Sequence, residues 1–174
     1  MRIKVTETKV YKFNELSEEA QDKTLSDLAN FETDREWWDT TLDCDANDIG
    51  LKIDTFDIDR GNSIKGSFLA SAEETAHKIK ETHGDVCDTY KTATQYLKDR
   101  DEAVDTCPRD ENGDMDEYEC DKRLDELDTE FLRAILEDYL VILRHEYENI
   151  TSREYLLDLI EANEWEFTEN GHIA

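Results

Sequence analysis

An apolar stripe in residues 124–142 constrains the fold of this chain more than any other feature. Its members are three or four positions apart, the spacing that places side chains on one face of an α-helix. They are Leu124, Leu127, Phe131, Ile135, Tyr139 and Ile142. The spacing predicts a long helix that begins near Asp116, and its apolar face must be covered by other elements.

Capping residues, helix-ending glycines and helical spacing predict five shorter helices. They are expected after Asn14 or Ser17, from Thr33 or Asp34 to Gly50, from Ser71 to about His83, from Asp85 to Arg100, and from Thr151 to Asn163. Ser71 and Thr151 each precede a glutamate by three positions, the pattern of a capping box. In the second helix, the residues expected on the buried face are Trp38, Leu42, Ala46 and Ile49.

Short runs of β-branched and aromatic residues predict the strands. An opening strand is expected in residues 1–12, a hairpin in Leu51–Asp59 and Ile64–Ala70 around the turn Arg60–Ser63, and a terminal strand in Trp165–Thr168 before the hairpin signal Asn170–Gly171. Together with the helices, these runs predict an α+β fold in which a small, mostly antiparallel sheet is packed by five or six helices. The length of 174 residues and the lack of an internal repeat predict a single domain over residues 1–174.

The negative charge is concentrated in three segments. The formal net charge is −26, and acids outnumber bases by 10 to 3 in residues 31–60, by 14 to 3 in residues 101–130 and by 8 to 1 in residues 145–174. Clustered carboxylates repel one another and oppose compaction. Their retention therefore indicates that their field is used to attract a cationic partner.

Disorder, salt adaptation and simple solubility are the alternatives to a binding role for this charge. A disordered acidic tail would be poor in aromatic residues, whereas 9% of this chain is Phe, Trp or Tyr. A surface adapted to high salt would be acidic nearly everywhere, whereas residues 61–100 hold as many bases as acids. Salt adaptation and a charge that only maintains solubility stay open as alternatives.

Residues 99–121 are predicted to form an acidic connector before the long helix, and acids continue on that helix. Double-stranded DNA carries about one negative charge per 1.7 Å of axis, whereas carboxylates at every fourth position of a helix recur only about every 6 Å. Several acidic surfaces must therefore converge to imitate a nucleic acid. The residues expected to bind the partner are Asp39, Asp43, Asp48, Asp110, Asp114, Glu117, Asp121, Asp125 and Asp128.

The sequence contains no motif typical of a metal site, a cofactor site or a catalytic site. The segment that opens with Asp110, Asn112 and Asp114 departs from a calcium-binding loop because Met115 stands where that loop needs glycine. The four histidines and four cysteines lack the spacing of a zinc site and the frame of an activated nucleophile. We therefore expect no cofactor, no metal site and no enzymatic activity.

The cellular location follows from the apolar segments. The first residues show no pattern typical of an export signal, and the longest apolar run, Tyr139–Leu143, is too short to span a membrane. We expect a cytoplasmic protein that contacts neither a membrane nor nucleic acid directly. Disulfides are rare in that compartment, so Cys44 and Cys87 are expected to be buried thiols, and Cys107 and Cys120, which bracket the connector, to pair only under oxidation.

Three segments resemble small acidic proteins encoded by phages and prophages, some of which are labelled antitoxin-like: Val10–Ala20, Phe56–Asn62 and Ala162–Gly171. The resemblance implies a phage protein that acts in the cytoplasm of a host bacterium, and it transfers no catalytic residue. Together with the charge, it leads us to expect an inhibitor that binds a host defence protein, mimics DNA or RNA and blocks a nucleic-acid-binding groove. The alternative is an antitoxin or accessory protein that binds one basic partner without mimicry.

Overall fold

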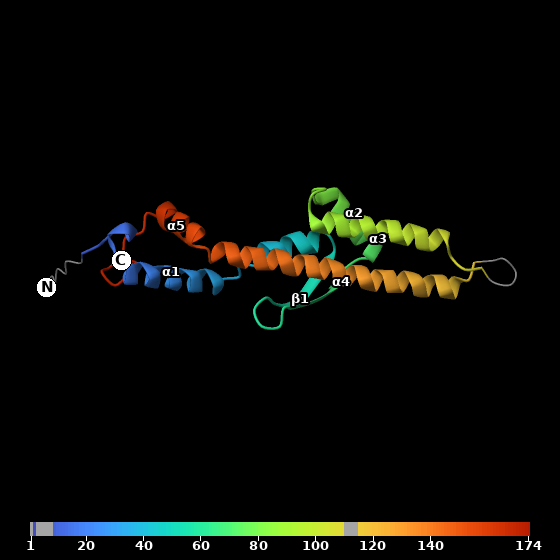
Figure 1. Ribbon diagram of the computed structural model, residues 1–174, viewed down its shortest axis with the longest axis horizontal. Coiled ribbons are helices and arrows are strands. Elements are labelled where there is room, and N and C mark those ends of the chain that lie inside the picture. Colours follow the sequence, from blue (N-terminus) through green and yellow to red (C-terminus); the bar gives the residue numbers. More distant parts are fainter. Residues whose placement is uncertain (1, 3–8, 110–114) are drawn as a thin grey trace. The chain divides into compact units, whose positions relative to one another are not determined.

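The computed structural model describes Arg2, residues 9–109 and residues 115–174. Within these residues the chain is α+β and 63% helical, and its sheet has two antiparallel strands (Figure 1). The predicted fold class is confirmed. In chain order, the elements are η1 (Phe13–Glu15), α1 (Glu18–Thr33), η2 (Thr40–Ala46), β1 (Leu51–Asp57), β2 (Ser63–Phe68), α2 (Ala72–Thr82), α3 (Asp88–Asp105), α4 (Glu117–Ile150) and α5 (Arg153–Ala162).

The contacts within the chain separate two compact units, where the sequence predicts one domain. Unit 1 combines Met1–Trp37 with His145–Ala174, and unit 2 is the continuous segment Trp38–Arg144. Each unit has an apolar core of its own. Helix α4 therefore supplies residues to both units.

The core of unit 1 lies between α1 and α5. The Ser17 hydroxyl caps α1 by accepting a hydrogen bond from the Ala20 amide, as predicted. Ser152 caps α5 in the same way, one residue later than the predicted Thr151. The buried apolar side chains of this core are Leu16, Ala20, Leu28, Leu156, Ile160 and Phe167.

The C-terminal segment of unit 1 forms a turn without a strand. Phe167 makes only isolated antiparallel bridges, to Tyr11 and to Ile173, so the predicted terminal strand is wrong while the turn at Asn170–Gly171 is present. Gly171 has a φ of +79°, and a Cβ there would lie 2.5 Å from the Ala20 carbonyl oxygen. Only glycine allows the turn to approach α1 this closely. The opening strand predicted in residues 1–12 falls mostly outside the described residues.

The apolar stripe of α4 is buried in the core of unit 2, as predicted. Phe131, Ile135 and Tyr139 are each at most 3% exposed. They pack against the hairpin β1–β2, the helices α2 and α3, and η2. The Phe131 ring stacks on both Phe68 of β2 and Tyr96 of α3, so this one side chain joins three elements.

The predicted hairpin is confirmed, with both strands slightly shorter than expected. Leu51 pairs with Phe68 at one end and Asp57 with Ser63 at the other, and the register shifts between Ile53 and Thr55. In the turn, the Asp57 carboxylate accepts hydrogen bonds from the amides of Asp59, Arg60 and Gly61. These amides are the groups that could hold a phosphate in such a turn, and here a side chain of the same chain occupies them.

Two helices differ from their predicted bounds. Helix α1 continues to Thr33, residues 34–38 form turns and bends, and η2 is a π-helical segment that starts at Thr40, so the predicted helix start at Thr33 or Asp34 is wrong. Helix α3 continues to Asp105 and α4 begins at Glu117, so only residues 106–109 and 115–116 of the predicted connector (99–121) are described outside these helices. Carboxylates on exposed faces of α3 and α4 stay hydrated, so they do not prevent helix formation.

Two of the four cysteines differ from expectation. Cys44 and Cys87 are exposed free thiols, not buried ones. Cys107 and Cys120 form a disulfide with a Cα–Cα distance of 5.6 Å, within the usual range for such a bond. This disulfide joins the segment after α3 to the first turn of α4.

Candidate functional site

Helices α3 and α4 form an antiparallel pair that is rich in acidic side chains. Contacts between the helices pair early residues of α3 with late residues of α4: the Thr92 hydroxyl donates to Asp138 over 2.7 Å, and Tyr96 stacks on Phe131 with 4.2 Å between ring centroids. Closer to the connecting segment, Arg123 donates to the Thr106 hydroxyl. The Cys107–Cys120 disulfide closes this end of the pair.

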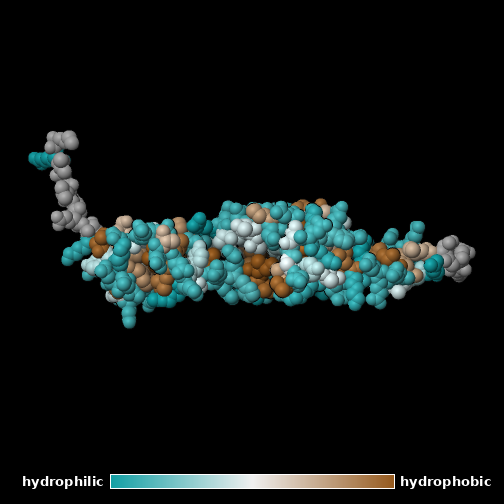
Figure 2. Space-filling view, turned by 90° about the horizontal axis from the view of Figure 1, so that it is seen from above, coloured by the Kyte–Doolittle hydropathy of each residue, from teal (hydrophilic) through white to brown (hydrophobic). Residues whose placement is uncertain are grey.

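Three predicted partner-binding residues lie on the face of α4 that points away from the core. We call Glu117, Asp121 and Asp125 the outer face of α4, and all three are exposed. In the described part of the chain, no cation lies within ion-pair distance of these carboxylates. Figure 2 shows that hydrophilic residues cover most of one face of the molecule. The outer face of α4 is therefore hydrated, negative and open to a partner.

Asp128, predicted to belong to the same row, has a structural role instead. Its carboxylate accepts hydrogen bonds from the Tyr96 hydroxyl, over 2.6 Å, and from Arg100, over 3.1 Å. Arg100 also contacts Glu73 of α2, so Asp128 closes a network that links α2, α3 and α4. Burial raises the pKa of Tyr96, and the hydrogen bond to Asp128 adds to the effect. These contacts occupy the Asp128 carboxylate within unit 2.

Asp39, Asp43 and Asp48 do not join this row. Asp39 and Asp48 are exposed and flank η2, and Asp43 lies within it. Because η2 packs beside Tyr139, it lies about 27 Å along α4 from Asp121 at 1.5 Å per residue. These aspartates therefore form a separate acidic surface. Asp110 and Asp114 lie outside the described residues.

A second set of carboxylates, which the sequence did not single out, lines a groove between α3 and α4. Two adjoining cavities of about 420 and 370 Å³ share Asp99, Leu127 and Glu130. We call this the α3–α4 groove, and its acidic residues are Asp99, Glu102, Glu126 and Glu130. Asp99 and Glu102 are three positions apart on α3, and Glu126 and Glu130 are four positions apart on α4, so each pair lies on one helix face. Only the packing of α3 against α4 brings these two faces together.

The least exposed histidine in the described part of the chain belongs to a structural network. His83 Nδ1 lies 2.7 Å from the Thr89 hydroxyl, and Nε2 lies 3.5 Å from Asp45, too far for a good hydrogen bond. His83 and the hydrogen bond from Tyr139 lower the pKa of Asp45. The Asp45 carboxylate, the His83 imidazole and the Thr89 hydroxyl follow one another in the order of a catalytic triad. Thr89, however, is only 3% exposed, so its hydroxyl is closed to a substrate and the contacts serve to join η2, α2 and α3.

Among the described residues, no group of three or more His, Cys, Asp or Glu side chains is arranged to hold a metal ion. No helix in residues 9–109 or 115–174 is both long and apolar enough to cross a membrane. In comparisons with known proteins, the chain matches no family model, no curated protein and no solved structure.

Proposed function

We propose that this protein inhibits a nucleic-acid-binding protein of a bacterial host by placing its acidic α3–α4 pair in the groove where the nucleic acid binds. The observation that carries the proposal is the outer face of α4, where Glu117, Asp121 and Asp125 are exposed and have no cationic partner among the described residues. Unpaired carboxylates held at fixed spacing on a helix produce a field that attracts a basic surface and speeds association with it.

The density of charge along the pair supports mimicry of one nucleic-acid strand. Carboxylates at every fourth position of α4 recur about every 6 Å, which is sparser than the phosphates of a duplex. The α3–α4 groove extends this set, because Glu126 and Glu130 follow Asp125 on α4 and share a cavity with Asp99 and Glu102 of α3. The seven carboxylates of the outer face and the groove span about 20 Å of α4, or about one charge per 3 Å, close to the value of about 3.4 Å per phosphate along one strand of DNA.

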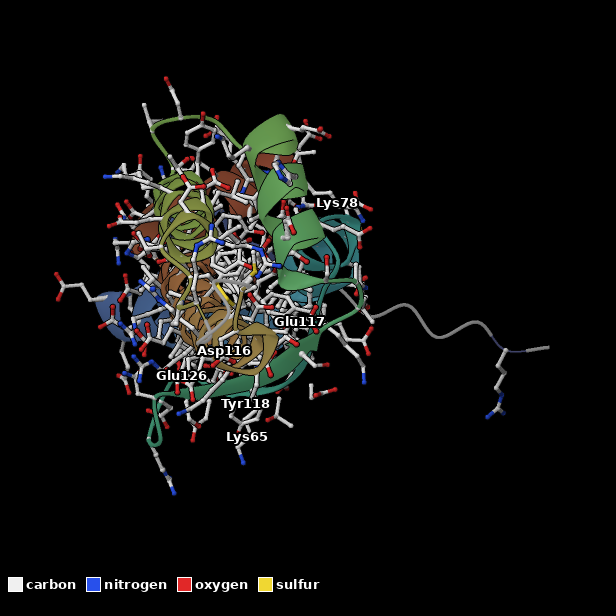
Figure 3. All side chains as sticks on the ribbon, turned by 90° about the vertical axis from the view of Figure 1, so that its right-hand side faces the viewer. Lys65, Lys78, Asp116, Glu117, Tyr118 and Glu126 are labelled. Carbon is white, nitrogen blue, oxygen red and sulfur yellow. A yellow bond between two sulfur atoms is a disulfide. The ribbon has the colours of Figure 1, made fainter. Side chains whose placement is uncertain are left out.

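The basic side chains of unit 2 do not all lie on one side of it. Figure 3 shows Lys78 of α2 on the opposite side of the ribbon from Glu126, and Lys65 of β2 on the same side as Tyr118 of α4. Lys122 lies among the carboxylates of α4, where it is outnumbered by Asp121, Asp125, Glu126 and Glu130. The excess of carboxylates on α3 and α4 would attract a basic partner.

Affinity capture from a host lysate, followed by competition with duplex DNA and with RNA, tests the proposal. We expect the captured protein to bind nucleic acid, to be released by nucleic acid, and to lose affinity steeply as salt rises, because it exchanges one polyanion for another. A triple variant of the outer face, Glu117→Gln with Asp121→Asn and Asp125→Asn, should weaken binding by about tenfold or more, as expected if a few charge pairs are lost.

A matched variant in unit 1 controls for net charge alone. Glu148→Gln with Asp158→Asn and Glu169→Gln removes three negative charges from exposed residues that no described cation pairs with. This variant should retain affinity within about threefold, because isolated surface charges contribute little. A captured partner that nucleic acid does not displace, and whose binding is insensitive to salt, would contradict mimicry and favour the antitoxin or accessory protein that binds one basic partner.

A further inference from the structure

The α3–α4 groove has an apolar floor as well as an acidic rim. The larger cavity is lined by Tyr96, Leu127, Phe131 and Ala134. The rings of Tyr96 and Phe131 stack on each other in its wall, with centroids 4.2 Å apart and an interplanar angle of 15°, and both side chains are buried. A cavity of about 420 Å³ is within the range of sites that bind small groups.

The carboxylates at the rim of the groove form no ion pairs within the described residues. Glu102, Glu126 and Glu130 have no ion-pair partner among the described residues, and Asp99 uses one oxygen to accept the Gln95 amide over 2.7 Å. The smaller cavity thus joins four carboxylates around Leu127.

The cations that reach the groove are already engaged. Lys91 lies 2.8 Å from Asp88, which also raises the pKa of Lys91. Arg123 donates to the Thr106 hydroxyl over 3.0 Å. The two cavities are lined by four carboxylates and by only these two cations, so the groove carries an excess of negative charge over an apolar floor.

We propose that the α3–α4 groove receives an arginine side chain from a basic segment of the partner protein. The three methylene groups of arginine would cover the apolar floor, while its planar guanidinium would donate paired hydrogen bonds to Asp99 and Glu130. Lysine carries a compact, strongly hydrated charge that does not form such paired bonds. This inference rests on the proposed function, because it states how the acidic surface recognises its basic partner.

Binding of labelled peptides to the full-length protein tests the inference without knowledge of the partner. The probes are an oligoarginine peptide and an oligolysine peptide of equal length and charge, measured by fluorescence anisotropy at physiological salt. We expect the arginine peptide to bind about fivefold or more tightly than the lysine peptide, a difference of about 1 kcal/mol. Equal affinity for the two peptides would overturn the inference.

Two double variants with the same change of charge locate the site. Asp99→Asn with Glu130→Gln changes the groove, and Asp121→Asn with Asp125→Asn changes the outer face of α4. The groove variant should lose about tenfold in affinity for the arginine peptide and lose the preference for arginine, while the outer-face variant keeps that preference. Circular dichroism confirms that both variants remain folded. If both variants lose affinity equally and keep the same preference, the groove is not the arginine site.

Failure of this inference is distinguishable from failure of the proposed function. The peptide assay involves no nucleic acid, whereas the proposed function depends on competition with DNA or RNA. Spermine, a flexible polyamine, is included as a competitor because its ammonium groups resemble those of lysine. If spermine displaces the arginine peptide at the same concentration as unlabelled oligolysine does, the groove recognises charge alone. That result would overturn the inference.

Discussion

Replacement of Asp128 by alanine should destabilise the protein, whereas replacement of Asp125 should not. Asp128 accepts hydrogen bonds from Tyr96 and Arg100, and Tyr96 is only 5% exposed. Loss of the acceptor leaves the Tyr96 hydroxyl buried without a partner, which costs about 1–3 kcal/mol. The ion pair with Arg100 adds at most about 1 kcal/mol, because the Asp128 side chain is 35% exposed.

Asp125→Ala is the matched control because it removes the same charge from the same helix. Both variants gain up to about 0.7 kcal/mol of helix propensity, and both relieve repulsion among neighbouring carboxylates. These shared gains cancel in the comparison. The free energy of unfolding of Asp128→Ala should therefore be about 2 kcal/mol lower than that of Asp125→Ala.

Thermal melts followed by far-ultraviolet circular dichroism measure this difference. For a protein of this size, about 2 kcal/mol corresponds to a melting temperature lower by about 4–8 °C. Urea denaturation gives the free energies independently. Melting temperatures that agree within about 1 °C would refute the structural role of Asp128 and return it to the set of partner-binding residues.

Four further predictions concern stability. The melting temperature should rise from low to moderate salt, because salt screens repulsion in a chain with a net charge of −26; a fall would show that ion pairs dominate. Asp138→Asn should melt at a higher temperature than the parent at pH 7, because burial raises the pKa of Asp138 and its charged form opposes folding; melts at decreasing pH should show the advantage shrinking as the parent carboxyl, bonded to Thr92, takes up its proton. Tyr139→Phe should cost about 1–3 kcal/mol in urea denaturation, because the buried hydroxyl donates to Asp45 over 2.7 Å, and an unchanged midpoint would argue against that bond. Gly171→Ala should cost about 1 kcal/mol or more by the same method, because the residue has a φ of +79° and lies against α1; full stability would show that the turn can move.

Local signals in the sequence predicted the starts of α1 and α2 and the turn after η2. The Ser17 and Ser71 hydroxyls accept hydrogen bonds from amides three residues later, and Gly50 adopts a φ of +85° between η2 and β1. These interactions depend on a few neighbouring residues, so a short pattern is sufficient to identify them.

The prediction of the second helix was wrong because the backbone conformation there depends on contacts with distant residues. Trp37 packs edge-on against Tyr147 of α4, and Trp38 packs edge-on against Phe56 of β1. The steps of three and four from Trp38 to Ile49 are those of an ordinary α-helix, yet the backbone over Thr40–Ala46 is π-helical. Tertiary packing therefore decides the backbone here, and spacing alone does not reveal it.

The candidate site was predictable only in part for the same reason. The acids of α4 stand out in the sequence, but Asp125 and Asp128 look alike until the positions of Tyr96 and Arg100 are known. The α3–α4 groove depends on which residues of α3 face which residues of α4. Only the pairing of the two helices fixes that, through contacts such as that between Thr92 and Asp138.

The division of the chain into two units sets an order in which they can form during synthesis. Unit 2 is the continuous segment Trp38–Arg144, so the ribosome completes all of its residues before it reaches α5. Unit 1 needs contacts between α1 and α5, whose partners are separated by the whole of unit 2. The apolar face of α1 therefore stays uncovered until α5 has been synthesised. Contacts between residues so far apart in the chain also form slowly.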